Sequence, residues 1–293
     1  MKRIFSTLFF CVVASCLMKS RAEQSVAERL LNEKRPVVIA HRGFSMVAPE
    51  NTLGAFELAI AAGADLVELD YYHAKDGVPV VIHDGTLDRT TDATNKFIAS
   101  KIRVESRTSK EITGLDAGSW FNPRFAAEKP PTLSEALDYI QKRGVTLIER
   151  KAGDAKACVE LLREKNLVNA LIVQAFDWDY LAEFHQLEPK QVLGALGPPS
   201  NRDGKKLADE EKKLNSGWVD EAQKTGARAV VWSRNVDKAA IDYAHSKGMK
   251  VWVYTINESE LANRLLDDGV DGIISDNPAL IWKTLALRCA STK

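Results

Sequence analysis

The segment VVIAHRGFSMVAPENTLGAF, residues 37–56, joins a short apolar run to the beginning of a helical pattern. The run at 37–40 is apolar and rich in β-branched residues, which is typical of a strand that is buried on both faces. A strand that only fills a core would end in turn residues, but this one ends in His41 and Arg42. Side chains of this kind suit phosphate chemistry, so the first strand is expected to end in a functional site.

The same alternation of apolar run and helical pattern continues to the end of the chain. Strands are expected at 36–41, 66–72, 145–150, 170–176, 191–196, 227–233, 250–256 and 271–275. Helices are expected near 51–62, 133–143, 154–165, 178–187, 207–225, 236–247, 258–268 and 278–289. Eight such units over about 250 residues predict a TIM (β/α)₈ barrel of the α/β class, in a domain at 36–290. A doubly wound open sheet is the alternative, but it usually has fewer units, and no G-x-G-x-x-G sequence follows the first strand.

Residues 78–131 separate the second expected strand from its helix. They contain an apolar run of their own at 78–83, followed by glycine, proline and charged residues with Trp120 and Phe121 among them. In a barrel, such an insertion would lie at the C-terminal ends of the strands, where active sites are built.

The charge balance narrows the class of partner. The 293 residues include 40 Lys and Arg against 40 Asp and Glu, for a formal net charge of +0. Proteins that bind nucleic acid as their main partner usually carry a basic stripe, so nucleic acid is not expected. A local cationic pocket for one phosphate of a small molecule is compatible with this balance.

The first 22 residues have the order of a secretory signal. Two basic residues precede an apolar run at 4–14, and small residues follow. The run is too short for a stable membrane span. We expect cleavage after Ala22 and therefore an exported protein, which would be periplasmic, at the cell surface or secreted. Alternatively, residues 13–16 resemble a bacterial lipoprotein box, in which case the signal would end at residue 15 and Cys16 would carry a lipid anchor.

Acidic side chains follow the strand period. Glu68 and Asp70 lie two residues apart, so both point to the same side of their strand, and Glu149 and Lys151 share that relation at the end of the strand at 145–150. Three carboxylates at one rim would repel one another strongly unless a positive charge neutralised them. A divalent cation with oxygen ligands, Mg²⁺ or Ca²⁺, is the usual solution. Ordinary salt bridges with neighbouring lysines and arginines are the alternative for each acid taken singly.

Two of the five histidines, His41 and His83, lie at the ends of expected strands. A lone histidine at such a place would often be structural, but two at one rim can act as a general acid and base, because the unperturbed pKa of histidine lies near neutrality. Arg42 and Lys151 add the cations that a phosphate needs, and Arg42 can bind two oxygens at once. Acids, histidines and cations together predict phosphoryl-ester chemistry.

A series of short motifs is spread along the chain in a specific order. The motifs are His41-Arg42-Gly43, Pro49-Glu50-Asn51-Thr52, Glu68-Leu69-Asp70, Asp76-Gly77, His83-Asp84, Glu149-Arg150-Lys151, Gln174, Asn257 and the segment 269–278. Together they resemble the signature of glycerophosphodiester phosphodiesterases, over about residues 37–283. His-Arg-Gly alone would be weak evidence, whereas the whole set at these spacings is specific.

The resemblance implies a TIM barrel with a small insertion and one divalent cation. By position it implies Glu68, Asp70 and Glu149 as metal ligands, His41 and His83 as acid and base, and Arg42 and Lys151 as phosphate ligands. It places four further residues around the site: Glu50, Asn51, Gln174 and Tyr254. Family members often have a tryptophan at the position of Tyr254, and this departure leaves the pocket for the alcohol open.

The leading hypothesis is a metal-dependent enzyme that hydrolyses glycerophosphodiesters to glycerol 3-phosphate and an alcohol. His41 is expected to be the base and His83 the acid, although the reverse is allowed, and the nucleophile is either water or the neighbouring glycerol hydroxyl through a cyclic phosphate. A second hypothesis is a phospholipase of the phosphatidylinositol or lysophospholipase D type, with Trp120, Phe121 and Phe125 at its rim. The third is a non-catalytic surface lipoprotein; loss of a metal acid or a histidine would favour it, and none is lost.

Overall fold

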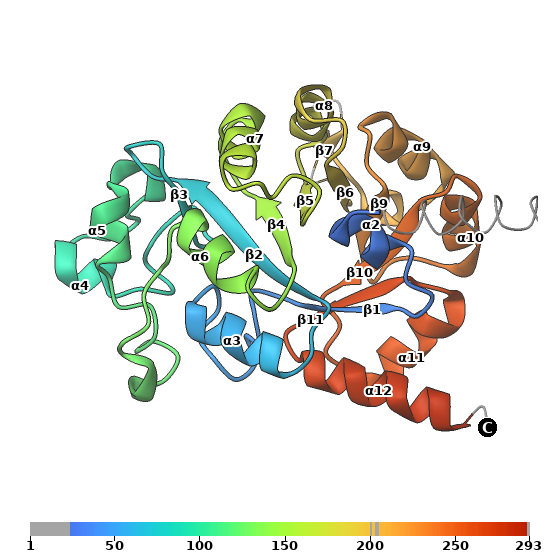
Figure 1. Ribbon diagram of the computed structural model, residues 1–293, viewed down its shortest axis with the longest axis horizontal. Helices are drawn as coiled ribbons and strands as arrows, with labels where there is room; N and C mark the ends of the chain where they lie inside the picture. Colours follow the sequence, from blue (N-terminus) through green and yellow to red (C-terminus); the bar gives the residue numbers. More distant parts are fainter. Residues whose placement is uncertain (1–23, 200, 203–204, 292–293) are drawn as a thin grey trace, which may run out of the picture.

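A closed barrel of parallel strands forms the centre of the computed structural model, which describes residues 24–199, 201–202 and 205–291 (Figure 1). Its strands are β1 (Val37–Ala40), β2 (Leu66–His73), β4 (Thr146–Arg150), β5 (Ile172–Ala175), β6 (Val192–Gly197), β9 (Ala229–Ser233), β10 (Lys250–Tyr254) and β11 (Gly272–Ser275). The first strand pairs in parallel with β2 on one side and with β11 on the other, which closes the sheet. The predicted TIM barrel is confirmed, and the open doubly wound sheet is wrong.

Helices surround this barrel (Figure 1). They are α3 (Leu53–Ala61), α6 (Leu133–Ile140), α7 (Ala155–Glu164), α8 (Trp178–Leu187), α9 (Ser216–Lys224), α10 (Lys238–Ser246), α11 (Ser259–Asp268) and α12 (Pro278–Ser291). Local signals set their ends: at α6 the side chain of Thr132 accepts a hydrogen bond from the backbone N–H of Glu135, and the Glu135 carboxylate accepts one from the backbone N–H of Thr132. No helix of the described residues is long and apolar enough to cross a membrane.

The helix expected at 207–225 is shorter than predicted. It begins at Ser216, because the side chain of Asn215 accepts a hydrogen bond from the backbone N–H of Trp218 and so caps the helix there. Upstream, the chain makes only a 3₁₀ turn at Asp209–Lys212, and the Trp218 indole donates to the carbonyl oxygen of Glu211. A short ribbon follows β6, made of β7 (Asn201–Arg202) and β8 (Lys205–Lys206).

Apolar side chains close the N-terminal end of the barrel. A short helix, α2 (Val26–Leu31), contributes Ala27 and Leu31 to the same buried cluster as inward-facing strand residues such as Val37 and Trp252. A larger apolar cluster fills the space between the strands and the outer helices. Since this end of the barrel is sealed by apolar groups, its polar interior residues gather at the opposite, C-terminal end of the strands.

The insertion after the second strand is confirmed. Within it, β3 (Pro79–Val81) pairs antiparallel with the last residues of β2, and two short helices follow, α4 (Ala93–Phe97) and α5 (Ser109–Thr113). The insertion extends from one side of the barrel in Figure 1. It has a small apolar cluster of its own around Leu87, Ile112 and Leu115. The loop that follows β3 therefore rests on a separate packed unit. The predicted leader at 1–22, including Cys16, lies outside the described residues.

Candidate active site

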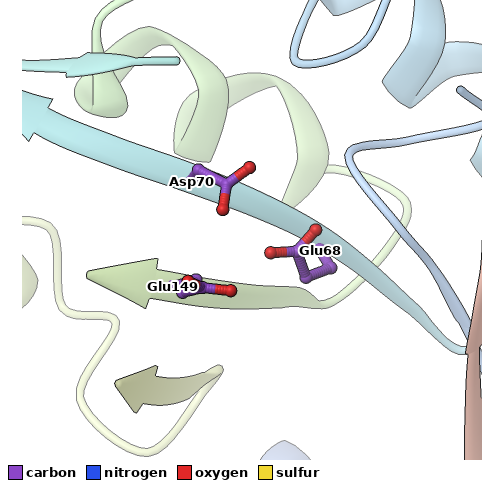
Figure 2. Close-up of side chains that lie close together, drawn as sticks. All are labelled: Glu68, Asp70 and Glu149. Atoms are coloured by element: carbon purple, nitrogen blue, oxygen red, sulfur yellow. The ribbon is translucent and has the colours of Figure 1, made fainter. Parts of the chain in front are cut away.

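Three carboxylates come together where β2 and β4 lie side by side (Figure 2). Asp70 stands opposite Glu149 in the parallel register, and Glu68 lies one strand period earlier on β2. Ligand atoms of the three side chains all lie within 4.8 Å of one another, and all three residues are buried. The strand period that the sequence displayed does bring these acids to one place.

Crowding and burial act strongly on the protonation of this cluster. Burial raises the pKa of Glu68 well above its ordinary value, and the charges of Asp70 and Glu149 add to the increase. Burial and the charge of Asp70 also raise the pKa of Glu149 to about 7, although Lys151 opposes the shift. Asp70 behaves differently: burial would raise its pKa, but the positive charges of Lys151 and Arg42 outweigh burial and lower it. The cluster therefore favours any further positive charge.

The three acids fit a hard divalent cation. Glu68 Oε1 is buried and has no hydrogen-bond partner among the described residues. Carboxylate oxygens are the ligands that Mg²⁺ and Ca²⁺ prefer in proteins. A cation here would neutralise the repulsion that raises the pKa values of Glu68 and Glu149. Glu68, Asp70 and Glu149 are the residues that could hold it.

Lys151 and Arg42 bring two cations to the cluster. The ammonium group of Lys151 lies 3.0 Å from Asp70 Oδ1 and also pairs with the carboxylate of Glu149. Burial would lower the pKa of Lys151, but Asp70 and Glu149 outweigh burial and raise it, so the side chain stays charged. On the other side, Arg42 Nε lies 3.4 Å from Asp70 Oδ2, and the backbone N–H of Arg42 donates to Glu68 Oε2 at 2.7 Å.

The loop after β1 supports the same cluster through Asn51. Its side-chain amide donates to Asp70 Oδ2 at 2.8 Å, and its carbonyl oxygen accepts from the backbone N–H of Asp70 at 3.2 Å. Asn51 has a φ of 60°, in the left-handed region that asparagine tolerates better than most residues. These two bonds fix the orientation of the Asp70 carboxylate.

His41 is held by a carboxylate that the sequence analysis assigned no role. His41 Nδ1 lies 2.6 Å from Asp276 Oδ1, and the hydroxyl of Ser45 lies 3.0 Å from the same oxygen. The amide of Asn257 donates to Asp276 Oδ2 at 2.6 Å, and its side-chain oxygen accepts from the backbone N–H of Asp276. His41 and Asp276 meet because each directly follows one of two paired strands, β1 and β11. That position after a strand was the available signal.

Asp276 is ionised in this arrangement. Burial alone would raise its pKa, but hydrogen bonding and charge interaction with His41, together with hydrogen bonds from Asn257 and Ser45, lower it to about 2. An ionised carboxylate on Nδ1 orients the imidazole and leaves Nε2 available on the other side of the ring.

His83 has a partner of the same kind. Its Nδ1 lies 2.7 Å from Asp84 Oδ1, and burial lowers the pKa of the imidazole. The guanidinium of Arg89 binds the Asp84 carboxylate with two hydrogen bonds and binds the carboxylate of Glu50 with two more. Glu50 also accepts from Arg42 Nη1 at 2.9 Å. Arg89 belongs to none of the motifs quoted from the sequence.

Comparison with known proteins agrees with this geometry. The model of the glycerophosphoryl diester phosphodiesterase family matches residues 41–280. The chain belongs to this family. A glycerophosphodiester phosphodiesterase of Bacillus subtilis (strain 168) is 33% identical over 277 residues, which cover 87% of this chain and 88% of the relative. One from Caldanaerobacter subterraneus subsp. tengcongensis is 32% identical over 251 residues, 83% of this chain and 95% of the relative.

A solved structure extends the likeness to three dimensions. An Oleispira antarctica phosphodiesterase in complex with the product sn-glycerol-3-phosphate superposes with a TM-score of 0.75 at 28% identity, covering 87% of this chain and 99% of that one. The resemblance drawn from the sequence motifs is thus confirmed, and the chain is an enzyme of the glycerophosphodiester phosphodiesterase family.

Two of the predicted residues lie beside the acidic cluster or across the barrel from it. Gln174 on β5 stands opposite Glu149 in the register, and its buried Oε1 has no hydrogen-bond partner among the described residues. Tyr254 ends β10, and its hydroxyl donates to the carbonyl oxygen of Gly197 at 2.7 Å. The ring of Phe176 meets Tyr254 edge-on, with 6.2 Å between centroids. Tyr254 and Phe176 thus place two contacting aromatic rings at the ends of β10 and β5, and Gln174 places a polar group beside the acids.

Proposed function

We propose that the chain hydrolyses glycerophosphodiesters to glycerol 3-phosphate and an alcohol, at the C-terminal ends of the barrel strands and with one divalent cation, Mg²⁺ or Ca²⁺. The observation that carries the proposal is a buried carboxylate cluster with Arg42 and Lys151 beside it, together with two carboxylate-paired histidines in the loops after β1 and β3. The Oleispira antarctica relative was solved with sn-glycerol-3-phosphate, and this supports the same product here.

Glu68, Asp70 and Glu149 would hold the cation. When bound, a divalent cation supplies positive charge that stabilises the developing negative charge on phosphoryl oxygens. Arg42 and Lys151 already lie beside these acids, and both are positioned to bind the same anionic oxygens. This arrangement answers the first difficulty of phosphodiester hydrolysis, which is the repulsion between an anionic phosphate and an incoming nucleophile.

The histidines answer the second difficulty, which is the poor leaving ability of an alkoxide. We assign His41 as the base that removes a proton from the nucleophile and His83 as the acid that protonates the departing alcohol. Asp276 and Asp84 each hold Nδ1 of one ring, so in both cases Nε2 is the atom that exchanges the proton. With the roles reversed, the same pairs would serve equally, and the leaving-group experiment in the Discussion distinguishes the two assignments.

The nucleophile is either water or the glycerol hydroxyl next to the phosphate, which would react through a cyclic phosphate. A substrate that lacks this hydroxyl separates the two routes. Only the water route hydrolyses the deoxy substrate.

Three aromatic residues of the insertion, Trp120, Phe121 and Phe125, are the candidates for a lipid-binding rim. Trp120 and Phe125 each meet Phe121 edge-on, with 5.7 Å between centroids. The rings contact one another, but Trp120 is 40% exposed and none of the three belongs to the apolar cluster of the insertion. They give no specific support to a lipid-binding rim.

The test is product profiling of the purified mature chain. Several glycerophosphodiesters and lysolipids are incubated with the enzyme, with EDTA and after restoration of Mg²⁺ or Ca²⁺. We expect glycerol 3-phosphate from the glycerophosphodiesters, loss of activity in EDTA and recovery with added metal. Full activity in EDTA, or hydrolysis of lysolipids alone, would overturn the proposal.

We also propose that the enzyme is exported. The order of basic, apolar and small residues at 1–22 supports the proposal. Mass spectrometry of protein from the native host should find an N-terminus at Glu23, or a lipid-modified Cys16. An intact Met1 on protein in the cytoplasmic fraction would contradict export.

A further inference from the structure

Arg89, on the loop that follows β3, connects two carboxylates of the site. Its Nε and Nη2 donate to Asp84 Oδ2 and Oδ1 at 2.6 and 3.0 Å. Its Nη1 and Nη2 donate to Glu50 Oε2 and Oε1 at 2.9 and 2.7 Å. Every nitrogen of this guanidinium thus faces a carboxylate that belongs to the site.

Each of these carboxylates has a second partner with a proposed role in the reaction. Asp84 Oδ1 also lies 2.7 Å from His83 Nδ1, and Glu50 Oε1 also accepts from Arg42 Nη1 at 2.9 Å. A continuous chain of hydrogen bonds therefore runs from the imidazole of His83 to the guanidinium of Arg42, with Arg89 at its centre.

The charges along this chain depend on Arg89. Asp84 and Glu50 are brought toward one another by a shared cation, and without it two like charges would face each other. Hydrogen bonds from Arg89 lower the pKa of Asp84, with burial opposing, and His83 adds to the decrease. In Glu50, burial would raise the pKa, but hydrogen bonds and charges from Arg89 and Arg42 outweigh it. Both groups are therefore held as carboxylates.

The shape of the arginine side chain is required as well as its charge. Arg89 binds two carboxylates bidentately and is half exposed, with a side-chain relative exposure of 44%. A lysine at this position would keep the charge but would present one point donor in place of a planar fork. Arg89 and its two carboxylate partners lie outside the apolar cluster that holds the insertion together.

We propose that Arg89 is a positioning residue that couples His83 to Arg42. It holds Asp84 where its oxygen accepts from His83 Nδ1, and it holds Glu50 against Arg42. Through Arg89, the insertion would thus fix the positions of both the acid–base group, His83, and the phosphate-binding group, Arg42. The inference rests on the proposed function, and it assigns Arg89 a task that its exposure does not indicate.

The test is a double-mutant cycle on kcat with a glycerophosphodiester. Arg89→Lys and Arg89→Ala should each lower kcat by about 10- to 100-fold, the range expected for losing a hydrogen bond between charged groups. In the Asp84→Asn background, Arg89→Ala should cause little further loss, because the two residues act on His83 in series. In a parallel cycle, Arg89→Ala should weaken inhibition by glycerol 3-phosphate, and Glu50→Gln should not add to that effect.

Arg107→Ala is the matched control. Arg107 lies in the same insertion, has a side-chain exposure of 31%, pairs with Glu111 and stacks on the ring of Phe97. This change should lower the melting temperature without altering kcat, and its effects should add to those of Asp84→Asn.

Three outcomes would overturn the role of Arg89: full additivity of Arg89→Ala with Asp84→Asn, an unchanged kcat in both Arg89 variants, or the same kcat loss in Arg107→Ala. Failure of the proposed function is separate, because the wild-type enzyme would then release no glycerol 3-phosphate. In that case the inhibitor-binding cycle, read as glycerol 3-phosphate affinity by calorimetry, still decides whether Arg89 acts on Arg42 through Glu50.

Discussion

Replacing Asp276 by asparagine should disable His41 while keeping the shape of the side chain. One oxygen of Asp276 faces His41 and Ser45, and the other accepts from the amide of Asn257. If the new amide keeps its oxygen toward Asn257, its NH₂ group points at His41 Nδ1. If it turns over, two NH₂ groups face each other at the Asn257 contact. Either orientation removes the anionic acceptor that orients the imidazole.

The size of the effect follows from the bond that is lost. A hydrogen bond to a charged acceptor contributes about 1.5–3 kcal/mol. If that energy stabilises the protonated imidazole in the transition state, kcat should fall about 10- to 150-fold, at about 1.36 kcal/mol for each factor of ten. The measurement is steady-state hydrolysis of a glycerophosphodiester at saturating metal, with the melting temperature recorded for each variant.

A third histidine–aspartate pair, at the opposite end of the barrel, provides the control. Asp271 precedes β11, and its Oδ2 lies 2.7 Å from His245 Nε2, at the N-terminal end of the strand that Asp276 follows. Asp271→Asn should affect stability and leave kcat unchanged. A kcat for Asp276→Asn within about twofold of the wild type, or an equal loss in Asp271→Asn, would refute the reasoning.

Three further predictions concern the metal and the histidines. A combined Glu68→Gln and Glu149→Gln variant should fold but lose its bound divalent cation; stoichiometric metal by elemental analysis would contradict the ligand assignment. Metal affinity should increase as the pH rises through about 7. The pKa of Glu149 is raised to about 7 and that of Glu68 well above its ordinary value, so protons must leave these carboxyl groups before their oxygens can bind the metal. Calorimetry that finds no proton release on metal binding below pH about 7 would count against this. His83→Ala and His41→Ala should each cost about 10²–10⁴-fold in kcat, and a p-nitrophenyl leaving group should rescue only His83→Ala. Rescue of His41→Ala alone would reverse the assignment of roles, and equal rescue of both variants, or of neither, would sink it.

The strands and the acidic residues that share a strand face could be predicted from the sequence, because they depend on patterns only a few residues long. The strand at 37–40 was visible as an apolar run, and Glu68 and Asp70 share a face because they lie two residues apart. The helix at 207–225 was overestimated for the same reason: a charged run has helical composition, but the cap at Asn215 decides where the helix begins.

The partner of His41 depends on long-range closure of the barrel and was not assigned. His41 and Asp276 are 235 residues apart, and they meet only because the last strand of the barrel pairs with the first. Arg89 lies in a loop without periodicity, so nothing in its neighbourhood showed that it would bind Glu50, 39 residues away. Contacts of this kind are set by the tertiary fold and carry little local signal.

Phosphorus NMR of a single reaction tests the central claim, that a cation at Glu68, Asp70 and Glu149 enables hydrolysis to glycerol 3-phosphate. Metal-free enzyme is mixed with a glycerophosphodiester, and Mg²⁺ or Ca²⁺ is then titrated in, for the wild type and for the Glu68→Gln variant. We predict that the glycerol 3-phosphate resonance grows with added metal in the wild type and stays near background in the variant. A wild-type rate that ignores the metal, or a variant that responds to it as the wild type does, would contradict the account.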